Sequence, residues 1–254
     1  MKKIAMITGA TAGFGEATAH EFAKNGYDVI ITGRRLERLN ALAAELKKQY
    51  GTEAHILNFD VRNYAETEKN IQSLPEKWQN IDVLVNNAGL ASGLSRIQEG
   101  NIEDWDKMID TNVKGMLYVT RCIAPVMIKN KKGHIINIGS TAGKEAYLNG
   151  NVYCATKFAV DALTRSMRID MLPHGIRVTS VCPGMAETEF SVVRFHGDAD
   201  RAKNVYKGMQ PLTAADIADV IYYVASRPAH VNVSDIVVTP LAQATINYIE
   251  RKES

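Results

Sequence analysis

Short apolar runs rich in β-branched residues alternate with helical patterns along nearly the whole chain, and no other feature constrains its fold as strongly. Most of these runs are apolar at consecutive positions, as in strands that helices cover on both faces of a sheet. The predicted strands are residues 3–8, 28–32, 54–59, 81–85, 134–138, 176–181 and 235–239. The predicted helices are residues 15–25, 35–50, 64–74, 102–129, 152–172 and 213–226. This alternation predicts an α/β fold with a doubly wound, mostly or wholly parallel seven-stranded sheet and helices on both faces.

The chain is expected to form a single domain over residues 1–254. Its composition, 46% hydrophobic and 23% charged, suits one large α/β domain, and no repeat, low-complexity tract or linker divides it. The one long irregular stretch is residues 185–211, which precedes a helix opening with the capping-box residues Thr213 and Asp216. A loop of this length favours a lid or binding segment, and a surface insertion without function is the alternative.

Composition also argues against several classes of function. The 30 Lys and Arg residues nearly balance the 28 Asp and Glu residues, so no nucleic-acid or anionic-membrane partner is expected. No apolar stretch approaches the roughly 18 residues that span a bilayer. The N-terminal apolar run ends at Thr8, too short for a signal peptide, so a cytoplasmic protein is expected. The three cysteines lie far apart without a Cys-x-x-Cys pair, and neither a disulfide nor a metal site is predicted.

A glycine-rich segment, TGATAGFG at 8–15, joins the first predicted strand to the first predicted helix. Its glycines, Gly9, Gly13 and Gly15, permit a tight turn and close approach of the backbone to a ligand. The helix that follows directs its free N–H groups and the positive end of its dipole toward an anion. The spacing GxxxGxG meets the usual dinucleotide-binding pattern only in part. The segment predicts a dinucleotide phosphate site, and an ordinary strand-to-helix turn is the alternative.

Two arginines, Arg34 and Arg35, follow the second predicted strand. A carboxylate at this place would bind the ribose 2′-hydroxyl of NAD, whereas an arginine suits the 2′-phosphate of NADP. No carboxylate stands there, so the sequence favours NADP. The alternative is that both arginines merely begin a solvated helix.

Tyr153 and Lys157 lie four residues apart on a predicted helix and therefore share a face. A lysine ammonium near a phenol lowers the phenol pKa from about 10, which would make Tyr153 usable as an acid or base. The spacing alone is weak evidence for a catalytic pair, because Tyr248 and Lys252 repeat it near the C-terminus. Ser140 distinguishes the first pair, since it stands just past a predicted strand, at the sheet edge where ligands bind.

These motifs together carry a resemblance to a known family. In chain order they are TGATAGFG (8–15), Asp60-Val61, NNAG (86–89), Asn112, Ser140, YCATK (153–157) and Pro183-Gly184. Their order resembles that of the short-chain dehydrogenases/reductases over nearly the whole chain. The resemblance implies a Rossmann-like domain and a catalytic tetrad of Asn112, Ser140, Tyr153 and Lys157.

The resemblance also implies a role for each member of the tetrad. Tyr153 would exchange a proton with the substrate oxygen, and Ser140 would hydrogen-bond that oxygen. Lys157 would lower the tyrosine pKa and bind the nicotinamide ribose, while Asn112 would hold a water of the proton relay; a helix-surface asparagine is the alternative for Asn112. The residues expected to bind the cofactor are Gly9, Ala10, Thr11, Ala12, Gly13, Phe14, Gly15, Arg34, Arg35, Asp60, Val61, Asn87, Ala88, Gly89, Tyr153, Lys157, Pro183, Gly184 and Thr188.

Within the family, the chain resembles the NADP-dependent 3-hydroxy acid dehydrogenases, which include serine and L-allo-threonine dehydrogenases that also reduce malonic semialdehyde. The matching segments are residues 8–16, 32–39, 58–62, 103–112, 133–143, 150–157, 188–198 and 228–240. This likeness implies small hydroxy-acid or oxo-acid substrates and a homotetramer. The chain departs from the group in a loop at 183–188 that is one residue shorter and in the charges of Lys144 and Glu145.

A carboxylate substrate needs a cationic or N–H-rich anchor, and two residues are candidates. Arg194 lies in the expected lid and Lys144 follows the serine strand, although each could equally be an exposed charge. A 3-oxoacyl carrier-protein reductase or another carbonyl reductase of the same family is the alternative enzyme. The non-enzyme alternative is an NADP-binding regulatory protein, which would be expected to lose the tyrosine or the lysine that this chain keeps.

Overall fold

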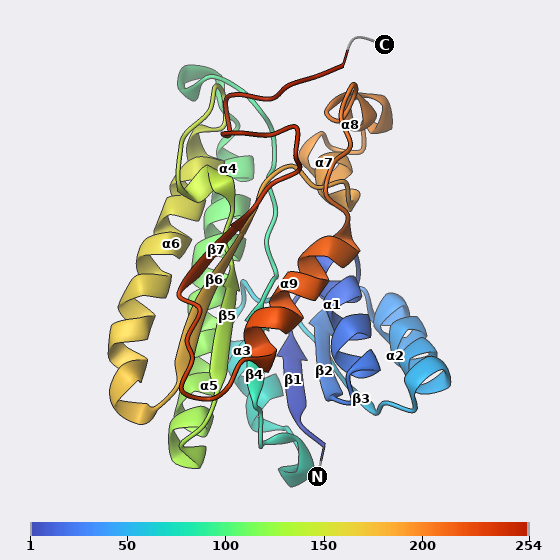
Figure 1. The fold of residues 1–254 in the computed structure, drawn as a ribbon, viewed down its shortest axis with the longest axis vertical. Coiled ribbons are helices and arrows are strands. Elements are labelled where there is room, and N and C mark those ends of the chain that lie inside the picture. The colour runs from blue at the N-terminus through green and yellow to red at the C-terminus, as the bar shows by residue number, and fades with distance from the viewer. Residues whose placement is uncertain (1, 253–254) are drawn as a thin grey trace.

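The strands form one sheet of seven, all parallel, in the order β3-β2-β1-β4-β5-β6-β7 (Figure 1). The computed structural model describes residues 2–252; residues 1, 253 and 254, the ends of the expected domain, lie outside the described residues. The strands are β1 Ile4–Ile7, β2 Asp28–Gly33, β3 Ala54–Asn58, β4 Val83–Asn86, β5 His134–Ile138, β6 Arg177–Pro183 and β7 Asp235–Val238. The predicted doubly wound α/β fold is confirmed. Because the strand order reverses between β1 and β4, a crevice is expected at their carboxyl ends.

Helices cover both faces of this sheet. They are α1 Gly13–Lys24, α2 Leu36–Tyr50, α3 Tyr64–Gln72, α4 Ile102–Ile109, α5 Met116–Asn130, α6 Asn151–Met171, α7 Glu189–Arg194, α8 Ala199–Asn204 and α9 Ala214–Ser226. Figure 1 shows α1 and α9 side by side across one face, where α2 also packs. The opposite face carries α3, α5 and α6.

Alternate residues of each strand enter different cores, which explains the continuous apolar runs. In β1, Ala5 and Ile7 pack with the core under α1, α2 and α9, whereas Ile4 and Met6 pack with the core under α3, α5 and α6. Successive side chains of a strand point to opposite faces, so a strand buried on both sides needs apolar residues at every position.

The helix predicted over residues 102–129 is interrupted, which corrects the sequence interpretation. A π-helical turn, Asp110–Gly115, separates α4 from α5 and contains Asn112. Gly115 belongs there because a Cβ on it would lie 2.7 Å from Cγ2 of Val61. Such π turns are rare and are frequent at functional sites. Apolar periodicity does not detect one inserted residue in a long helix.

The stretch expected to be irregular, residues 185–211, contains the two short helices α7 and α8. Thr188 and Asp198 cap them, since the Oγ1 of Thr188 accepts from Phe190 N and a carboxylate oxygen of Asp198 accepts from Arg201 N. The capping box of Thr213 and Asp216 at the start of α9 is confirmed.

His134 gives the fold a predicted acid sensitivity. It lies buried on β5, its Nε2 is 2.7 Å from Oγ1 of Thr179, and its Nδ1 has no hydrogen-bond partner among the described residues. Burial, with the nearby charge of Arg177, lowers the pKa of His134 to about 3. An unfolded histidine takes up its proton near pH 6.5. Below that pH the unfolded chain therefore binds a proton that the folded chain does not bind.

We expect this residue alone to lower the free energy of unfolding by about 1.4 kcal/mol per pH unit as the pH falls below about 6.5. Urea unfolding of the protein and of His134→Gln, measured at a series of pH values, isolates the contribution. The two proteins should differ in their dependence on pH between about 6.5 and 4.5. Parallel curves would contradict this assignment.

Candidate active site

A cavity of about 560 Å³ lies at the carboxyl ends of the strands, within the size range of small-molecule sites. Most of the predicted residues line it: Gly9, Thr11, Ala12, Gly13, Phe14, Arg34, Arg35, Asp60, Val61, Asn87, Ala88, Gly89, Ser140, Tyr153, Lys157, Pro183, Gly184 and Thr188. Three predicted residues, Ala10, Gly15 and Asn112, do not line it. The structure therefore gathers sites that are separated by up to about 180 positions in the chain.

The glycine-rich turn forms a backbone cradle at one end of this cavity. Gly9 and Gly13 have φ angles of +67° and +57°, which L side chains adopt rarely. Gly15 allows close packing, because a Cβ on it would lie 2.4 Å from the carbonyl oxygen of Gly9. The Nδ2 of Asn87 holds the same turn through Thr8 O at 2.8 Å. Among the described residues no side chain caps the start of α1, so its first N–H groups are free to bind an anion.

Ala10 and Gly15 thus shape the glycine-rich turn without lining the cavity. Ala10 is fully buried, and its N–H donates to Thr32 O at 2.9 Å. The donor set at this turn fits a pyrophosphate, since it consists of backbone N–H groups and a helix N-terminus with space above them.

The substitution Gly15→Ala is expected to lower the free energy of unfolding by about 1–3 kcal/mol and to lower NADP(H) affinity. The added Cβ meets backbone, which cannot move aside as a flexible side chain can. Urea unfolding and fluorescence titration with NADPH measure the two effects. Gly26→Ala is the control: its φ of +83° is also strained, but its Cβ meets nothing within 4 Å. Unchanged NADPH affinity in Gly15→Ala would contradict the role of the cradle.

Arg34 and Arg35 line one end of the cavity, and Arg35 contacts the segment 185–211, which is called the lid below. Arg35 donates from Nε to Oγ1 of Thr11 at 3.0 Å and from Nη1 to Oε2 of Glu189 at 3.1 Å. Arg38 donates to the other oxygen of Glu189 at 2.7 Å. These two hydrogen bonds, the stronger from Arg38, lower the pKa of Glu189. Sequence reasoning proposed Arg34 and Arg35 but missed Arg38 and Glu189, whose pairing joins α2 to the distant α7.

Ser140, Tyr153 and Lys157 meet at the other end of the cavity. Ser140 lies just past β5, and its Oγ accepts from Ala142 N at 3.0 Å. Lys157, buried one helical turn beyond Tyr153 on α6, donates from Nζ to Ile138 O at 2.9 Å. Its Nζ lies 5.9 Å from the centroid of the Tyr153 ring. The tyrosine ring packs edge-on against Phe190 of α7, with centroids 5.7 Å apart.

The expectation that Lys157 lowers the pKa of Tyr153 is wrong for the protein alone. Burial is the largest influence and raises the pKa of Tyr153, while a hydrogen bond with Ser140 and the charge of Arg194 lower it to a smaller extent. Burial also lowers the pKa of Lys157, to about 8. Burial disfavours the charged form of both groups, and the ammonium donates to Ile138 O. Tyr153 is therefore a neutral phenol in this structure.

Asn112 is buried and holds the loop after β4. Its Oδ1 accepts from Leu90 N at 2.8 Å, and its Nδ2 donates to Leu90 O at 2.8 Å and to Oγ1 of Thr156 at 3.0 Å. A Cβ on Gly89 would lie 3.2 Å from Asn112 Oδ1 and 3.8 Å from Lys157 Nζ. The alternative of a helix-surface asparagine is thus wrong, and both amide hydrogens are used within the protein. Its contact with a relay water stays a prediction.

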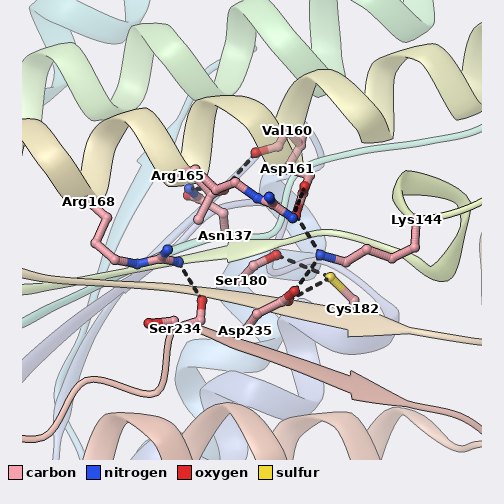
Figure 2. A network of polar contacts seen from close by, with 11 residues as sticks. Asn137, Lys144, Val160, Asp161, Arg165, Arg168, Ser180, Cys182, Ser234 and Asp235 are labelled. Carbon is pink, nitrogen blue, oxygen red and sulfur yellow. Dashed lines mark hydrogen bonds and ion pairs between the residues drawn. The ribbon is translucent and has the colours of Figure 1, made fainter.

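Lys144 does not face the cavity, which removes it as a carboxylate anchor. Figure 2 shows its Nζ between Asp161 of α6 and Asp235 of β7. The bond to Asp161 Oδ1 is 2.6 Å, and both carboxylates raise the lysine pKa. Asp235 also accepts from Sγ of Cys182 at 3.4 Å. Lys144, whose charge beside the serine strand departs from the resembled group, therefore links α6 to β7, the edge strand of the sheet.

Several residues that line the cavity were not among the predicted site residues. They are Tyr147, Glu189, Phe190, Tyr206, Gln243, Ile246 and Ile249. Gln243 is buried, and its Oε1 accepts from Met185 N at 2.8 Å, which fixes the start of the lid. A Cβ on Gly184 would lie 2.3 Å from that same oxygen. Gln243 follows the last strand and belongs to no local motif, so its contact with Met185 is visible only in the folded structure.

Two findings bear on metals and membranes. Within residues 2–252, no group of three or more His, Cys, Asp or Glu side chains is placed to hold a metal ion. Over the same residues, no helix combines the length and apolar character that crossing a bilayer requires.

Comparison with known proteins gives consistent likenesses. A profile described as short chain dehydrogenase matches residues 3–198. An NADP-dependent 3-hydroxy acid dehydrogenase of Salmonella typhi is 48% identical over 242 residues, which cover 95% of this chain and 96% of that protein. A serine 3-dehydrogenase of Agrobacterium fabrum is 45% identical over 249 residues, 98% of each chain.

Solved structures agree with this result. The closed form of a serine dehydrogenase complexed with NADP+ matches with a TM-score of 0.91 and 45% identity, covering 98% of this chain and 100% of that one. A 3-ketoacyl-(acyl-carrier-protein) reductase from Brucella melitensis, complexed with NADH, matches with a TM-score of 0.82 but only 27% identity, over 93% of this chain and 96% of that one. The matched profile, the near-complete coverage and the shared fold show that this chain belongs to the short-chain dehydrogenase family.

Proposed function

We propose that this protein is an NADP-dependent oxidoreductase that interconverts small 3-hydroxy acids and the matching 3-oxo acids or semialdehydes by hydride transfer. L-serine, L-allo-threonine, 3-hydroxyisobutyrate and 3-hydroxypropionate are the proposed substrates. The observation that carries the proposal is one cavity lined at one end by Arg34 and Arg35 and at the other by Ser140, Tyr153 and Lys157. The 48% and 45% identities to a 3-hydroxy acid dehydrogenase and a serine dehydrogenase support the substrate class.

NADP(H) fits the residues that line this cavity, and when bound it would accept or supply the hydride. The glycine turn and the start of α1 would bind its pyrophosphate, and Arg34 and Arg35 its 2′-phosphate. Asp60 and Val61 would contact the adenine, as the family resemblance implies. The remaining assignments, also from the resemblance, are Asn87, Ala88 and Gly89 on the adenosine ribose, Lys157 on the nicotinamide ribose, and Pro183, Gly184 and Thr188 over the nicotinamide.

Tyr153 would exchange a proton with the substrate oxygen, which Ser140 would hold by a hydrogen bond. Because burial raises the pKa of Tyr153, the phenol carries the proton that reduction of a carbonyl consumes. Oxidation needs that proton removed. We therefore expect reduction to be favoured at low pH and oxidation to rise toward alkaline pH.

The proposal extends to assembly and location. Ile102 of α4 and Phe158 and Ile169 of α6 are large apolar side chains exposed on the single chain, and Leu172 follows α6 in the same state. Large apolar side chains exposed on two helices support burial against a second copy, and we propose a homotetramer of single-domain chains in the cytoplasm. With a net charge of +2, no nucleic-acid or membrane partner is proposed.

A substrate panel tests the reaction. The purified protein is assayed for NADPH formation from NADP+ with L-serine, L-allo-threonine and 3-hydroxyisobutyrate, and for NADPH consumption with malonic semialdehyde. Acetoacetyl thioester and a simple ketone are assayed beside them. Turnover of the acids well above that of the thioester supports the proposal. Preference for the thioester would replace it with a carrier-protein reductase, a class represented among the structural relatives.

A further inference from the structure

Arg194, the last residue of α7, brings a guanidinium from the lid into the cavity beside the reacting tyrosine. Its Cζ lies 5.8 Å from the centroid of the Tyr153 ring and 5.4 Å from that of Tyr147. Nη2 donates to the hydroxyl of Tyr147 at 2.6 Å, and Nε points to Gly93 O at 3.4 Å. The backbone at this point is fixed as well, since Gly93 N donates to Arg194 O at 2.9 Å.

Among residues 2–252 this cation lacks a carboxylate partner, as Lys157 does, whereas the arginines at the opposite end of the cavity have one. Arg35 and Arg38 share Glu189, and Arg34 faces Asp60 at 3.7 Å. A guanidinium has five N–H donors. The N–H groups of Arg194 that do not donate to Tyr147 or Gly93 have no hydrogen-bond partner within the described part of the chain.

Arg194 is partly buried, and a charge partly withdrawn from water is stabilised by a counter-ion. The groups that share the tyrosine end with Arg194, among them Tyr147, Tyr153 and Phe190, offer no negative charge. Glu189, the lid carboxylate that lines the cavity, is held by Arg35 and Arg38 at the opposite end. An anion from outside the chain would therefore complete the site, and a planar donor fork matches a carboxylate best.

We infer that Arg194 binds the carboxylate of the substrate while Tyr153 and Ser140 hold its hydroxyl or carbonyl oxygen. The inference rests on the proposed function and deepens it, because it names the group that selects acids over neutral alcohols and thioesters. Tyr147 is a positioning residue, since its hydroxyl orients the Nη2 edge of the guanidinium. The carboxylate of a bound substrate would thereby join the lid to the catalytic end of the cavity.

The test compares a hydroxy acid with its neutral ester. In Arg194→Met, kcat/KM for 3-hydroxyisobutyrate is expected to fall about 10²–10³-fold, whereas kcat/KM for its methyl ester changes by less than about 3-fold. Arg194→Lys keeps the charge but not the fork, so its loss should be intermediate. Arg201→Met is the matched control in the same lid: Arg201 lies on α8 over the Phe195 ring, 4.3 Å from its centroid, and does not line the cavity.

Equal losses for acid and ester in Arg194→Met would overturn the inference, because they would show that Arg194 only shapes the lid. So would an unchanged kcat/KM for the acid. Calorimetric binding of unreactive isobutyrate and isobutyramide to the NADP+-bound protein separates this inference from the proposed function. Isobutyrate bound more tightly than the amide by the unsubstituted protein, but not by Arg194→Met, would support the anchor even if no acid is turned over. Equal binding of both compounds by the unsubstituted protein would reject it.

Discussion

Replacing Tyr153 with phenylalanine is expected to lower kcat for the hydroxy-acid oxidation about 10²–10⁴-fold, the range by which a positioned general acid or base accelerates a reaction. The substitution removes one hydroxyl and keeps the ring that packs against Phe190 at 5.7 Å. The fold and the cradle at the other end of the cavity should therefore be unaffected. Steady-state assay of kcat, with fluorescence titration of NADPH affinity, separates chemistry from binding.

Tyr248→Phe is the matched control for this prediction. Tyr248 has the same spacing to a lysine, Lys252, but 63% of its surface is exposed and it does not line the cavity. Its substitution should leave kcat within about twofold, because ordinary surface changes shift free energies by no more than about 0.5 kcal/mol. Retained activity in Tyr153→Phe would remove the tyrosine from the chemistry.

The double substitution Arg34→Ala and Arg35→Ala is expected to weaken NADPH binding about 10²-fold and NADH binding far less. Only the phosphorylated dinucleotide offers an anion to these guanidiniums, and a hydrogen bond to a charged group contributes about 1.5–3 kcal/mol. Both side chains line the cavity beside the glycine turn. Dissociation constants for both reduced dinucleotides, measured by fluorescence titration, give the preference directly.

Arg38→Ala controls for the lid contact in that experiment. Arg38 binds the same Glu189 carboxylate as Arg35, at 2.7 Å, but does not line the cavity. It should change the affinities for NADPH and NADH by the same factor. If the double substitution also weakens both dinucleotides equally, the arginines serve only in contacts within the protein, Arg35 with Thr11 and Glu189 and Arg34 with Asp60.

Much of the framework could be predicted because its signals are local. The strands are short and apolar at consecutive positions since each supplies two cores, as Ala5 and Met6 do in adjacent positions of β1. The glycine turn is recognisable because the positive φ of Gly9 and Gly13 restricts the residue types allowed there. The capping box at Thr213 is also complete within four residues.

What escaped prediction depends on contacts between distant segments. α7 and α8 have six residues each, too few to show helical periodicity. Whether Lys144 faced the cavity depended on Asp161 and Asp235, which lie 17 and 91 residues further along the chain. Neither partner is visible from the local pattern around the serine strand.

The protonation state of Tyr153 also could not be predicted from the sequence. The spacing of Tyr153 and Lys157 correctly predicts a shared helix face. The sign of the pKa shift of Tyr153 nevertheless follows from burial, which raises it. Burial is a property of the assembled lid and strands, and spacing along one helix does not report it.

The most direct test follows a hydride from substrate to cofactor. The protein is given NADP+ and 3-hydroxyisobutyrate deuterated at the hydroxyl-bearing carbon, and the NADPH formed is analysed by mass spectrometry. The account predicts NADPH that carries a single deuterium, formed far faster than NADH is formed from NAD+ under the same conditions. Failure to form NADPH, or formation of NADPH without deuterium, would contradict it.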